Sequence, residues 1–169
     1  QLFYGRREPR RVGNRHPLST PFGCFAAKDG MFALCVLNEK HFALLAGLMG
    51  KAGLERDPRF NSDSARTAHE PELKSMIETW SKDFTRDEIV AVLATAGIPA
   101  APIRGFSDAA VSEQAAARRL VTALPHDKLG TVSVVAQPVW FDGEKPQATQ
   151  SAPGLGQHSA EVLSELGVQ

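Results

Sequence analysis

Three consecutive segments between residues 38 and 97 carry apolar side chains at helical spacing, with residues that start or stop helices at their ends. In the middle segment, Leu73, Met76, Ile77 and Trp80 follow one another at i, i+3, i+4 and i+7, which places them on one face of a helix. Proline is tolerated in the first turn of a helix, and Pro71 stands just before this stripe. The spacing therefore predicts a helix from about residue 70 whose apolar face is turned toward a core.

The boundaries of the other two helices are also marked in the sequence. Thr85 and Glu88 have the spacing of a capping box, and Gly97 can close that helix in a left-handed conformation before Pro99. Asn38 can cap the first helix through its side-chain oxygen. We expect these three helices to form the framework of the fold.

Extended structure is predicted on both sides of the helices. The turn signal of residues 28–30 (Lys-Asp-Gly) precedes a continuous apolar run over residues 31–37, which predicts a hairpin whose second strand is buried on both faces. Residues 98–103 form an extended segment that two prolines brace. Strands next to helices indicate an α/β fold.

The C-terminal third carries weaker signals. Short helical turns are predicted within residues 107–119, and extended pieces over residues 132–136 and 139–141, which Pro138 separates. Residues 159–166 form an amphipathic helix, with Val162, Leu163 and Leu166 on one face. No internal repeat is visible in the sequence.

Composition excludes several classes of protein. A chain of 169 residues with 43% hydrophobic residues can bury a core in one domain, or in two small ones. Because 19 basic residues balance 19 acidic ones, a dedicated nucleic-acid binder is not expected. No apolar run approaches the roughly 18 residues that span a bilayer, so we expect no membrane partner. Cys24 and Cys35 are too few and too separated for a disulfide framework, which favours a cytoplasmic location.

The N-terminal segment of residues 1–16 is basic, with five arginines opposed only by Glu8. It shows no helical or strand period, so we interpret it as a solvated linker, with a phosphate-facing arm as the alternative. Because the sequence begins with Gln1 and not with methionine, we expect a truncated or processed product.

The residues alone do not define a catalytic set. The five histidines are scattered and lie in no metal-binding motif, so no metal site is expected. The sequence contains no G-x-S-x-G motif and no phosphate-binding glycine loop of either common type. Most acids stand in turns or at helix starts, where a structural role explains them. Glu39 is ambiguous, because it follows a buried strand at the start of a helix, and such junctions often line clefts.

Several short segments, taken together in their order and spacing, suggest a family. They are Gly13-Asn14-Arg15-His16-Pro17, Pro21-Phe22-Gly23, Lys28-Asp29-Gly30, Asp57-Pro58-Arg59-Phe60 with Arg66, Trp80, residues 97–103, residues 152–158 and residues 161–167. Over residues 13–167 this pattern resembles the C-terminal portion of the class III CoA-transferases. That family includes formyl-CoA transferase, carnitine CoA-transferase and the α-methylacyl-CoA racemases.

The resemblance implies an α/β enzyme about twice as long as this chain, which as a fragment would look α+β. Residues 1–27 would form a linker and a glycine-containing loop, residues 28–105 a small α/β domain, and residues 106–169 a return segment to the large domain. The full enzyme would be an interlocked homodimer. Its nucleophilic Asp would lie in the N-terminal large domain, and no Asp of this chain matches that motif. The fragment is therefore expected to have no catalytic nucleophile and to be inactive alone.

The implied reaction transfers CoA between an acyl-CoA and a carboxylic acid, through an aspartyl anhydride and an aspartyl-CoA thioester. Coenzyme A would be a co-substrate, and no covalently bound cofactor or metal is expected. Besides these substrates, the expected partners are the chain's own N-terminal domain and a second copy.

The resemblance also implies site residues. Gly13, Asn14, Arg15 and His16 would belong to a loop that closes over the reacting centre, with a plain connecting loop as the alternative. In the racemases an acidic residue near the position of Glu39 assists proton transfer, which would make Glu39 an acid/base group. A 2-methylacyl-CoA racemase and a non-catalytic interaction module remain the alternative functions.

Overall fold

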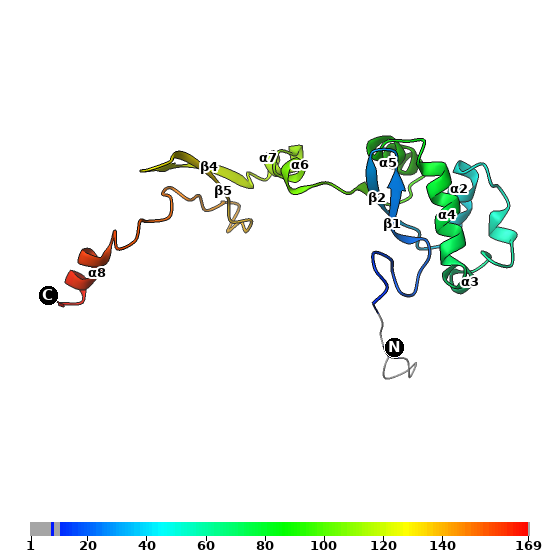
Figure 1. Cartoon of the computed structure of the whole chain (residues 1–169), viewed down its shortest axis with the longest axis horizontal. Coiled ribbons are helices and arrows are strands. Elements are labelled where there is room, and N and C mark those ends of the chain that lie inside the picture. Colours follow the sequence, from blue (N-terminus) through cyan, green and yellow to red (C-terminus); the bar gives the residue numbers. More distant parts are fainter. Residues whose placement is uncertain (1–7, 9–10, 169) are drawn as a thin grey trace. The chain divides into compact units, whose positions relative to one another are not determined.

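The computed structural model describes residue 8 and residues 11–168, which fall into two compact units that divide between Ile103 and Arg104 (Figure 1). Each unit contains both helices and strands, so the α/β fold class predicted from the sequence is confirmed. Most of the predicted N-terminal linker, including Arg6, Arg7 and Arg10, lies outside the described residues. No helix in the described part of the chain is long and apolar enough to cross a membrane.

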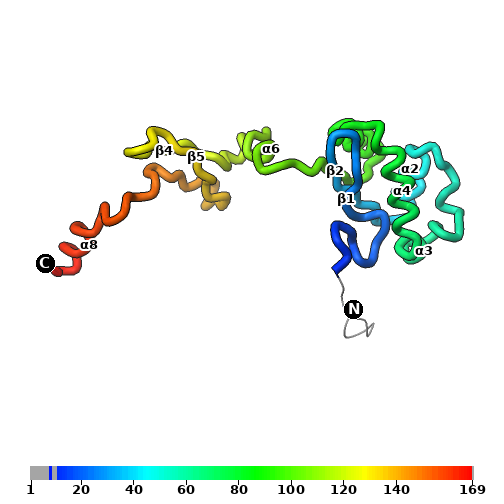
Figure 2. Tube along the Cα trace, in the orientation of Figure 1, coloured from blue at the N-terminus to red at the C-terminus, as the bar shows by residue number. Residues whose placement is uncertain are grey.

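The first unit contains a three-stranded antiparallel sheet in the order β1-β2-β3, formed by Phe22–Ala27, Gly30–Cys35 and Ala100–Pro102. The predicted hairpin is confirmed, because β1 and β2 pair directly and Phe25 stands opposite Phe32. The tube in Figure 2 shows β1 and β2 side by side, and β3 pairs antiparallel with β2, with Phe32 opposite Pro102. The sheet thus joins segments about 70 residues apart in sequence.

One prediction about this sheet is wrong. The second strand is not buried on both faces: Phe32 and Leu34 are buried, whereas Met31 is 38% exposed. Leu37, at the end of the apolar run, is 63% exposed. Successive side chains of a strand point to opposite faces, and only one face of β2 turns its side chains into the core. The run is continuous in sequence because small side chains, such as Ala33, alternate with the large ones.

The helices of the first unit follow the predicted pattern, with two short additions. They are α2 (Glu39–Leu48), the one-turn η1 (Leu54–Arg56), α3 (Asp63–Ala68), α4 (Glu70–Ser81) and α5 (Arg86–Thr95). Asn38 caps α2 by accepting the His41 backbone N–H at 2.8 Å, and the Thr85/Glu88 capping box at α5 is complete. Sequence periodicity did not predict α3, because six residues are too few to show an apolar stripe.

One apolar cluster holds the first unit together. It is built from side chains of β1, β2 and the helices that pack on the sheet. Its buried members are Phe25, Phe32, Leu34, Val36, Phe42, Leu45, Met49, Phe60, Leu73, Ile77, Ile89, Leu93 and Ile98. The predicted stripe of α4 contributes Leu73 and Ile77 fully, while Trp80 packs against the cluster from its edge.

The second unit consists of short elements. They are α6 (Phe106–Ala110), α7 (Glu113–Ala117), the hairpin of β4 (Val121–His126) and β5 (Gly130–Val135), and α8 (Ser159–Glu165). The short helices, β5 and α8 confirm the predictions for this region. Strand β4 was not predicted. Of the extended piece predicted over residues 139–141, only Phe141 pairs, in an antiparallel bridge with Glu144 across the turn of residues 142–143.

The second unit buries few side chains. Its buried apolar residues are Ala115, Leu124 and Ala136, and its one buried charged residue is Lys145, within the described part of the chain. The Lys145 Nζ donates to the backbone carbonyl of Arg118 at 2.7 Å and to that of Arg119. Burial of the Lys145 ammonium group, together with the positive charges of Arg119 and Arg118, lowers the pKa of Lys145. The apolar face of α8 remains open, with Leu166 71% exposed.

The contrast between the units gives a first prediction. Leu93→Ala removes a side chain that is 0% exposed, and we expect it to lower the free energy of unfolding of the first unit by about 2–5 kcal/mol. Leu163→Ala is the matched control, because Leu163 is 46% exposed and its truncation leaves no core cavity. Denaturant titration of the 169-residue chain measures both, and equal effects of the two substitutions would contradict the assignment of the core.

Candidate functional site

The loop of residues 13–16 lies along the outer edge of β1. The Cys24 backbone N–H donates to the Asn14 carbonyl at 3.0 Å, and the His16 N–H donates to the Phe22 carbonyl at 2.7 Å. Arg15 forms an antiparallel bridge with Gly23 between these two bonds. The His16 ring stacks on Phe22, with centroids 4.9 Å apart. The loop is therefore docked as a short extra strand, and it covers an edge of the sheet that would otherwise be unpaired.

Two glycines make this arrangement possible in different ways. A Cβ on Gly23 would stand 2.5 Å from the Asn14 carbonyl oxygen, so any larger residue would push the loop off β1. Gly13 has φ +70°, a left-handed conformation that glycine adopts without steric cost, and no heavy atom lies within 4 Å of its Cβ position. Gly23 thus allows the close approach of the two backbones, whereas Gly13 allows the chain to turn into the loop.

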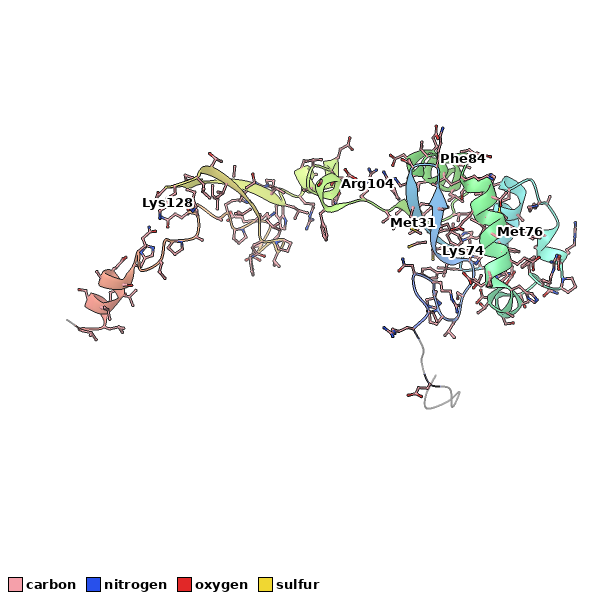
Figure 3. All side chains as sticks on the ribbon, viewed as in Figure 1. Met31, Lys74, Met76, Phe84, Arg104 and Lys128 are labelled. Carbon is pink, nitrogen blue, oxygen red and sulfur yellow. The ribbon has the colours of Figure 1, made fainter. Side chains whose placement is uncertain are left out.

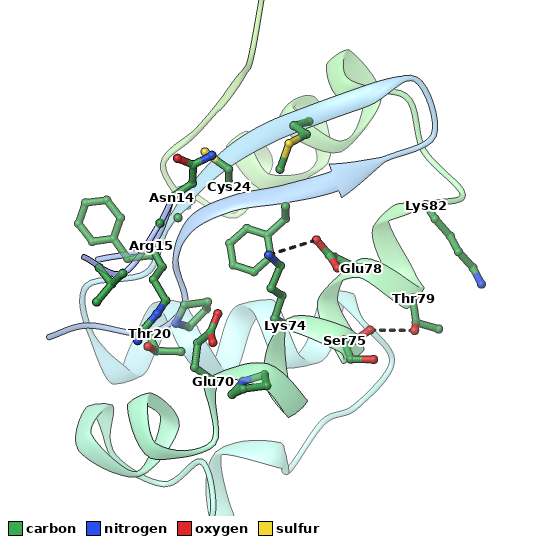
Figure 4. Close-up of a pocket in the computed structure, with 18 residues that line it drawn as sticks. Asn14, Arg15, Thr20, Cys24, Glu70, Lys74, Ser75, Glu78, Thr79 and Lys82 are labelled. Carbon is green, nitrogen blue, oxygen red and sulfur yellow. Dashed lines mark hydrogen bonds and ion pairs between the residues drawn. The ribbon is translucent and has the colours of Figure 1, made fainter. Parts of the chain in front are cut away.

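A groove of about 690 Å³ lies between this loop, β1 and helix α4 (Figure 4). Figure 3 labels two of the residues that line it, Met31 on β2 and Lys74 on α4. Its polar lining comes from the loop and from one face of α4: Asn14, Arg15, Thr20, Glu70, Lys74, Ser75, Glu78, Thr79 and Lys82. In Figure 4, Arg15 and Glu70 lie toward one end of the groove and Lys82 toward the other.

The groove has a mixed electrostatic character. Glu78 is already engaged, because its Oε1 accepts the Ala26 backbone N–H at 3.0 Å and lies 3.9 Å from the Lys74 Nζ. Arg15 and Lys82 form no ion pair with any residue that the structure describes. The groove therefore presents both basic and acidic side chains, Glu70 among the latter, beside the partly exposed apolar side chain of Met31.

A second hollow, of about 560 Å³, lies on the other side of the same loop. Its lining is mainly apolar, and it includes both thiols of the chain, Cys24 and Cys35, together with His16. Burial raises the pKa of the Cys35 thiol. Because the thiolate and not the thiol is the nucleophile, Cys35 is a poor candidate for covalent chemistry at neutral pH. The loop thus forms a ridge between a polar groove and an apolar hollow.

The structure places Glu39 in an ion pair outside both hollows. Its Oε2 accepts Arg66 Nη1 at 2.7 Å and its Oε1 accepts Arg66 Nη2 at 3.1 Å, a two-point contact between carboxylate and guanidinium. Arg66 is 1% exposed, so Glu39 supplies the counter-charge of a buried cation. Of the residues expected at the site, the four loop residues 13–16 lie together between the groove and the hollow. Glu39 lines neither of them.

Other acids hold the backbone in place, as expected from their positions in turns and helix starts. Asp29 accepts the Arg86 backbone N–H at 2.7 Å, which lowers the pKa of the Asp29 carboxyl. Hydrogen bonds from the Arg59 side chain and backbone lower the pKa of Asp57 to about 2. No group of three or more potential metal ligands comes together among the residues that the structure describes.

Sequence reasoning missed the part of the groove that α4 contributes. The signal was present, since Lys74, Ser75, Glu78, Thr79 and Lys82 follow the spacing of a helix face opposite the apolar stripe. A polar helix face usually meets only water, so nothing in the spacing distinguishes this face from any other polar helix face. Only the docking of the 13–16 loop across from it makes it one wall of a groove.

Comparison with known proteins places this loop and fold in one family. The model of CoA-transferase family III matches residues 1–159, so the chain belongs to that family, as the short segments had indicated. The acetyl-CoA:oxalate CoA-transferase of Acetobacter aceti is 32% identical over 161 residues, which cover 95% of this chain and 40% of that protein. The succinate–glutarate CoA-transferase of Agrobacterium fabrum is 29% identical over 160 residues, with the same two shares.

A solved structure agrees with the sequence relatives. A CAIB/BAIF family protein from Brucella suis superposes with a TM-score of 0.81 and 31% identity, over 98% of this chain and 42% of that one. The chain therefore spans about 40% of the length of the relatives it matches.

The close approach at Gly23 gives a second prediction. We expect Gly23→Ala to detach the loop from β1, because the added Cβ would overlap the Asn14 carbonyl. Amide hydrogen exchange at His16 and Cys24 should then be faster by about tenfold or more, which corresponds to a loss of about 1.4 kcal/mol. Gly47→Ala is the control, since its Cβ meets nothing within 4 Å. Unchanged exchange in Gly23→Ala would show that the loop does not depend on this contact.

Proposed function

We propose that this chain is the C-terminal portion of an enzyme that transfers CoA from an acyl-CoA to a carboxylic acid. The observation that carries the proposal is the match to CoA-transferase family III over residues 1–159, combined with relatives about two and a half times as long. Their names describe CoA transfer between small organic acids. Which acids serve this protein as donor and acceptor is left open by the proposal.

In the proposed reaction, a carboxylate nucleophile upstream of this chain attacks the thioester carbonyl and releases the CoA thiolate, which leaves a mixed anhydride. The thiolate then attacks the aspartyl carbonyl of the anhydride, which releases the donor acid and leaves an aspartyl-CoA thioester. The acceptor carboxylate repeats both steps in reverse order. Splitting the transfer in this way replaces one difficult displacement by several easier ones.

In this scheme the chain supplies the loop that shields the reacting centre. An anhydride is hydrolysed by water, so the enzyme must exclude water while the intermediate exists. The 13–16 loop suits this role, because Gly13 presents no side chain and Arg15 brings a positive charge to the edge of the groove. The docking of the loop on β1 supports the proposal, since a shield must be held in a defined place.

The position of Glu39 supports the transferase over a racemase. A proton-transfer acid or base must lie within reach of its substrate, and Glu39 lines neither the groove nor the hollow. In this structure both oxygens of Glu39 accept hydrogen bonds from Arg66. We therefore assign Glu39 the role of counter-ion to Arg66.

The proposed partners of the chain are its own N-terminal portion and a second copy. Large apolar side chains of the second unit support this, because Phe106 is 98% exposed and Val135 is 85% exposed. Large apolar side chains that stand this exposed are suited to a contact with another protein surface.

An exchange assay tests the proposed function. Labelled acyl-CoA is incubated with a panel of carboxylic acids and either the 169-residue chain or the same chain preceded by its N-terminal portion. We expect exchange of CoA between the acids only with the longer polypeptide, because the nucleophile lies upstream. Turnover by the isolated chain would contradict the proposal, as would the absence of exchange with every acid of a broad panel.

The role of the loop can be tested in the longer polypeptide with Gly13→Val. We expect kcat to fall more than tenfold, which requires a loss of only about 1.4 kcal/mol of transition-state stabilisation. Gly50→Val is the matched control, because Gly50 has φ +68° and its Cβ likewise meets nothing within 4 Å. Both substitutions introduce similar backbone strain, of about 1–2 kcal/mol. Equal kcat values in the two variants would remove the loop from the active site.

A further inference from the structure

Thr20 is the buried anchor of the segment that connects the 13–16 loop to β1. It is 3% exposed, although it lies in an irregular stretch of chain where Leu18 is 58% exposed. Each polar group of Thr20 has a partner on the same short helix, α3. The Thr20 N–H donates to Asp63 Oδ1 at 3.0 Å, and the Thr20 carbonyl accepts from Arg66 Nε at 2.7 Å. The Thr67 hydroxyl donates to the Thr20 hydroxyl at 3.2 Å.

The spacing of these partners explains how one helix reaches a single residue with three side chains. Asp63, Arg66 and Thr67 stand at i, i+3 and i+4, which are neighbours on one helix face. The Asp63 carboxylate accepts the hydrogen bond of the Thr20 N–H, and the Arg66 guanidinium donates to the Thr20 carbonyl. Because one partner of each bond is charged, both bonds are charge-assisted. Rotation of either peptide unit at Thr20 would break one of these bonds.

The helix that holds Thr20 is itself held by the core. A helix of six residues is marginal by itself, so α3 depends on its tertiary contacts. Arg66 provides them, because it also donates to Glu39 on α2 and to the Phe60 carbonyl at 3.1 Å. Its guanidinium lies over the Phe42 ring, 4.4 Å from the centroid. The anchor of the loop is thus connected to the apolar cluster of the first unit.

We propose that Asp63, Arg66 and Thr67 act as positioning residues, which clamp Thr20 and thereby fix the place of the 13–16 loop over β1. Thr20 lies four residues after His16 and two residues before Phe22. His16 and Phe22 are joined by a backbone hydrogen bond and by the stacking of their rings. Movement at Thr20 would therefore pull the loop out of register with β1. The role of the clamp in the reaction rests on the function proposed above, in which this loop covers the reacting centre.

The test uses Thr67, because its removal does not leave a buried charge. Thr67→Val keeps the shape of the side chain and removes the hydroxyl, while Thr67→Ser keeps the hydroxyl. Thr95→Val is the control, since the Thr95 hydroxyl bonds only within its own helix, to the Val92 carbonyl. Amide hydrogen exchange of the 169-residue chain is measured at His16 and Cys24 on the loop contact, and at Ile77 in the core.

In the chain, Thr67→Val should accelerate exchange at His16 and Cys24 by about tenfold with no change at Ile77, a local opening and not global unfolding. Thr67→Ser and Thr95→Val should both behave like the unmodified chain. Unchanged exchange at His16 and Cys24 would overturn the clamp. Equal acceleration at Ile77 would also overturn it, because Thr67 would then serve general stability only.

In the longer polypeptide, Thr67→Val should lower kcat several-fold with KM for the acyl-CoA nearly unchanged, and Thr67→Ser should restore kcat. Faster exchange at His16 with an unchanged kcat would overturn the positioning role. If the unmodified polypeptide transfers no CoA, the proposed function fails. The exchange measurement still decides whether the clamp exists, because it does not depend on activity.

Discussion

The guanidinium group of Arg66 joins α3 to the turn just before it and to two segments that are distant in the sequence, the chain at Thr20 and the start of α2. It donates to the Thr20 carbonyl, to both oxygens of Glu39 and to the Phe60 carbonyl, and its flat face covers the Phe42 ring. Burial of a charge in an apolar surrounding costs several kcal/mol unless hydrogen bonds and a counter-charge replace the lost water. At Arg66 this requirement is met only if the loop before β1, the start of α2, the turn before α3 and α3 itself all stand in their observed places. The group therefore specifies their mutual arrangement.

The candidate site is a consequence of this arrangement. Once the chain is held at Thr20, the preceding residues can pair with the edge of β1, and Gly23 lets them approach closely. The ridge that they form divides the surface into a polar groove against α4 and an apolar hollow that contains the two thiols. A loop that is paired along one edge and anchored at one end can be held in place and still be released without unfolding the core. The proposed role of the loop, as a shield for a water-sensitive acyl intermediate, requires these properties.

The two units differ in how completely they bury their apolar side chains. The first has a closed core of side chains that come mainly from the sheet and from the helices α2, α4 and α5. The second buries little more than Leu124 and the small residues beside it, and leaves the face of α8 open. Since the chain spans about 40% of the length of its relatives, the rest of the proposed enzyme provides a natural cover for this surface.

Local signals in the sequence determined the helices α2, α4 and α5, their caps at Asn38 and Thr85, the hairpin turn before Gly30, and the family. Such signals depend on residues a few positions apart, so neighbouring side chains suffice to specify them. The tertiary structure alone decided which face of β2 is buried, that Glu39 faces a buried cation, and that α4 supplies one wall of a groove. These features need contacts between residues far apart in the chain, such as Phe32 with Pro102, Glu39 with Arg66, and Ala26 with Glu78. No local pattern specifies such contacts, because burial and charge pairing arise only when the packed elements exclude water.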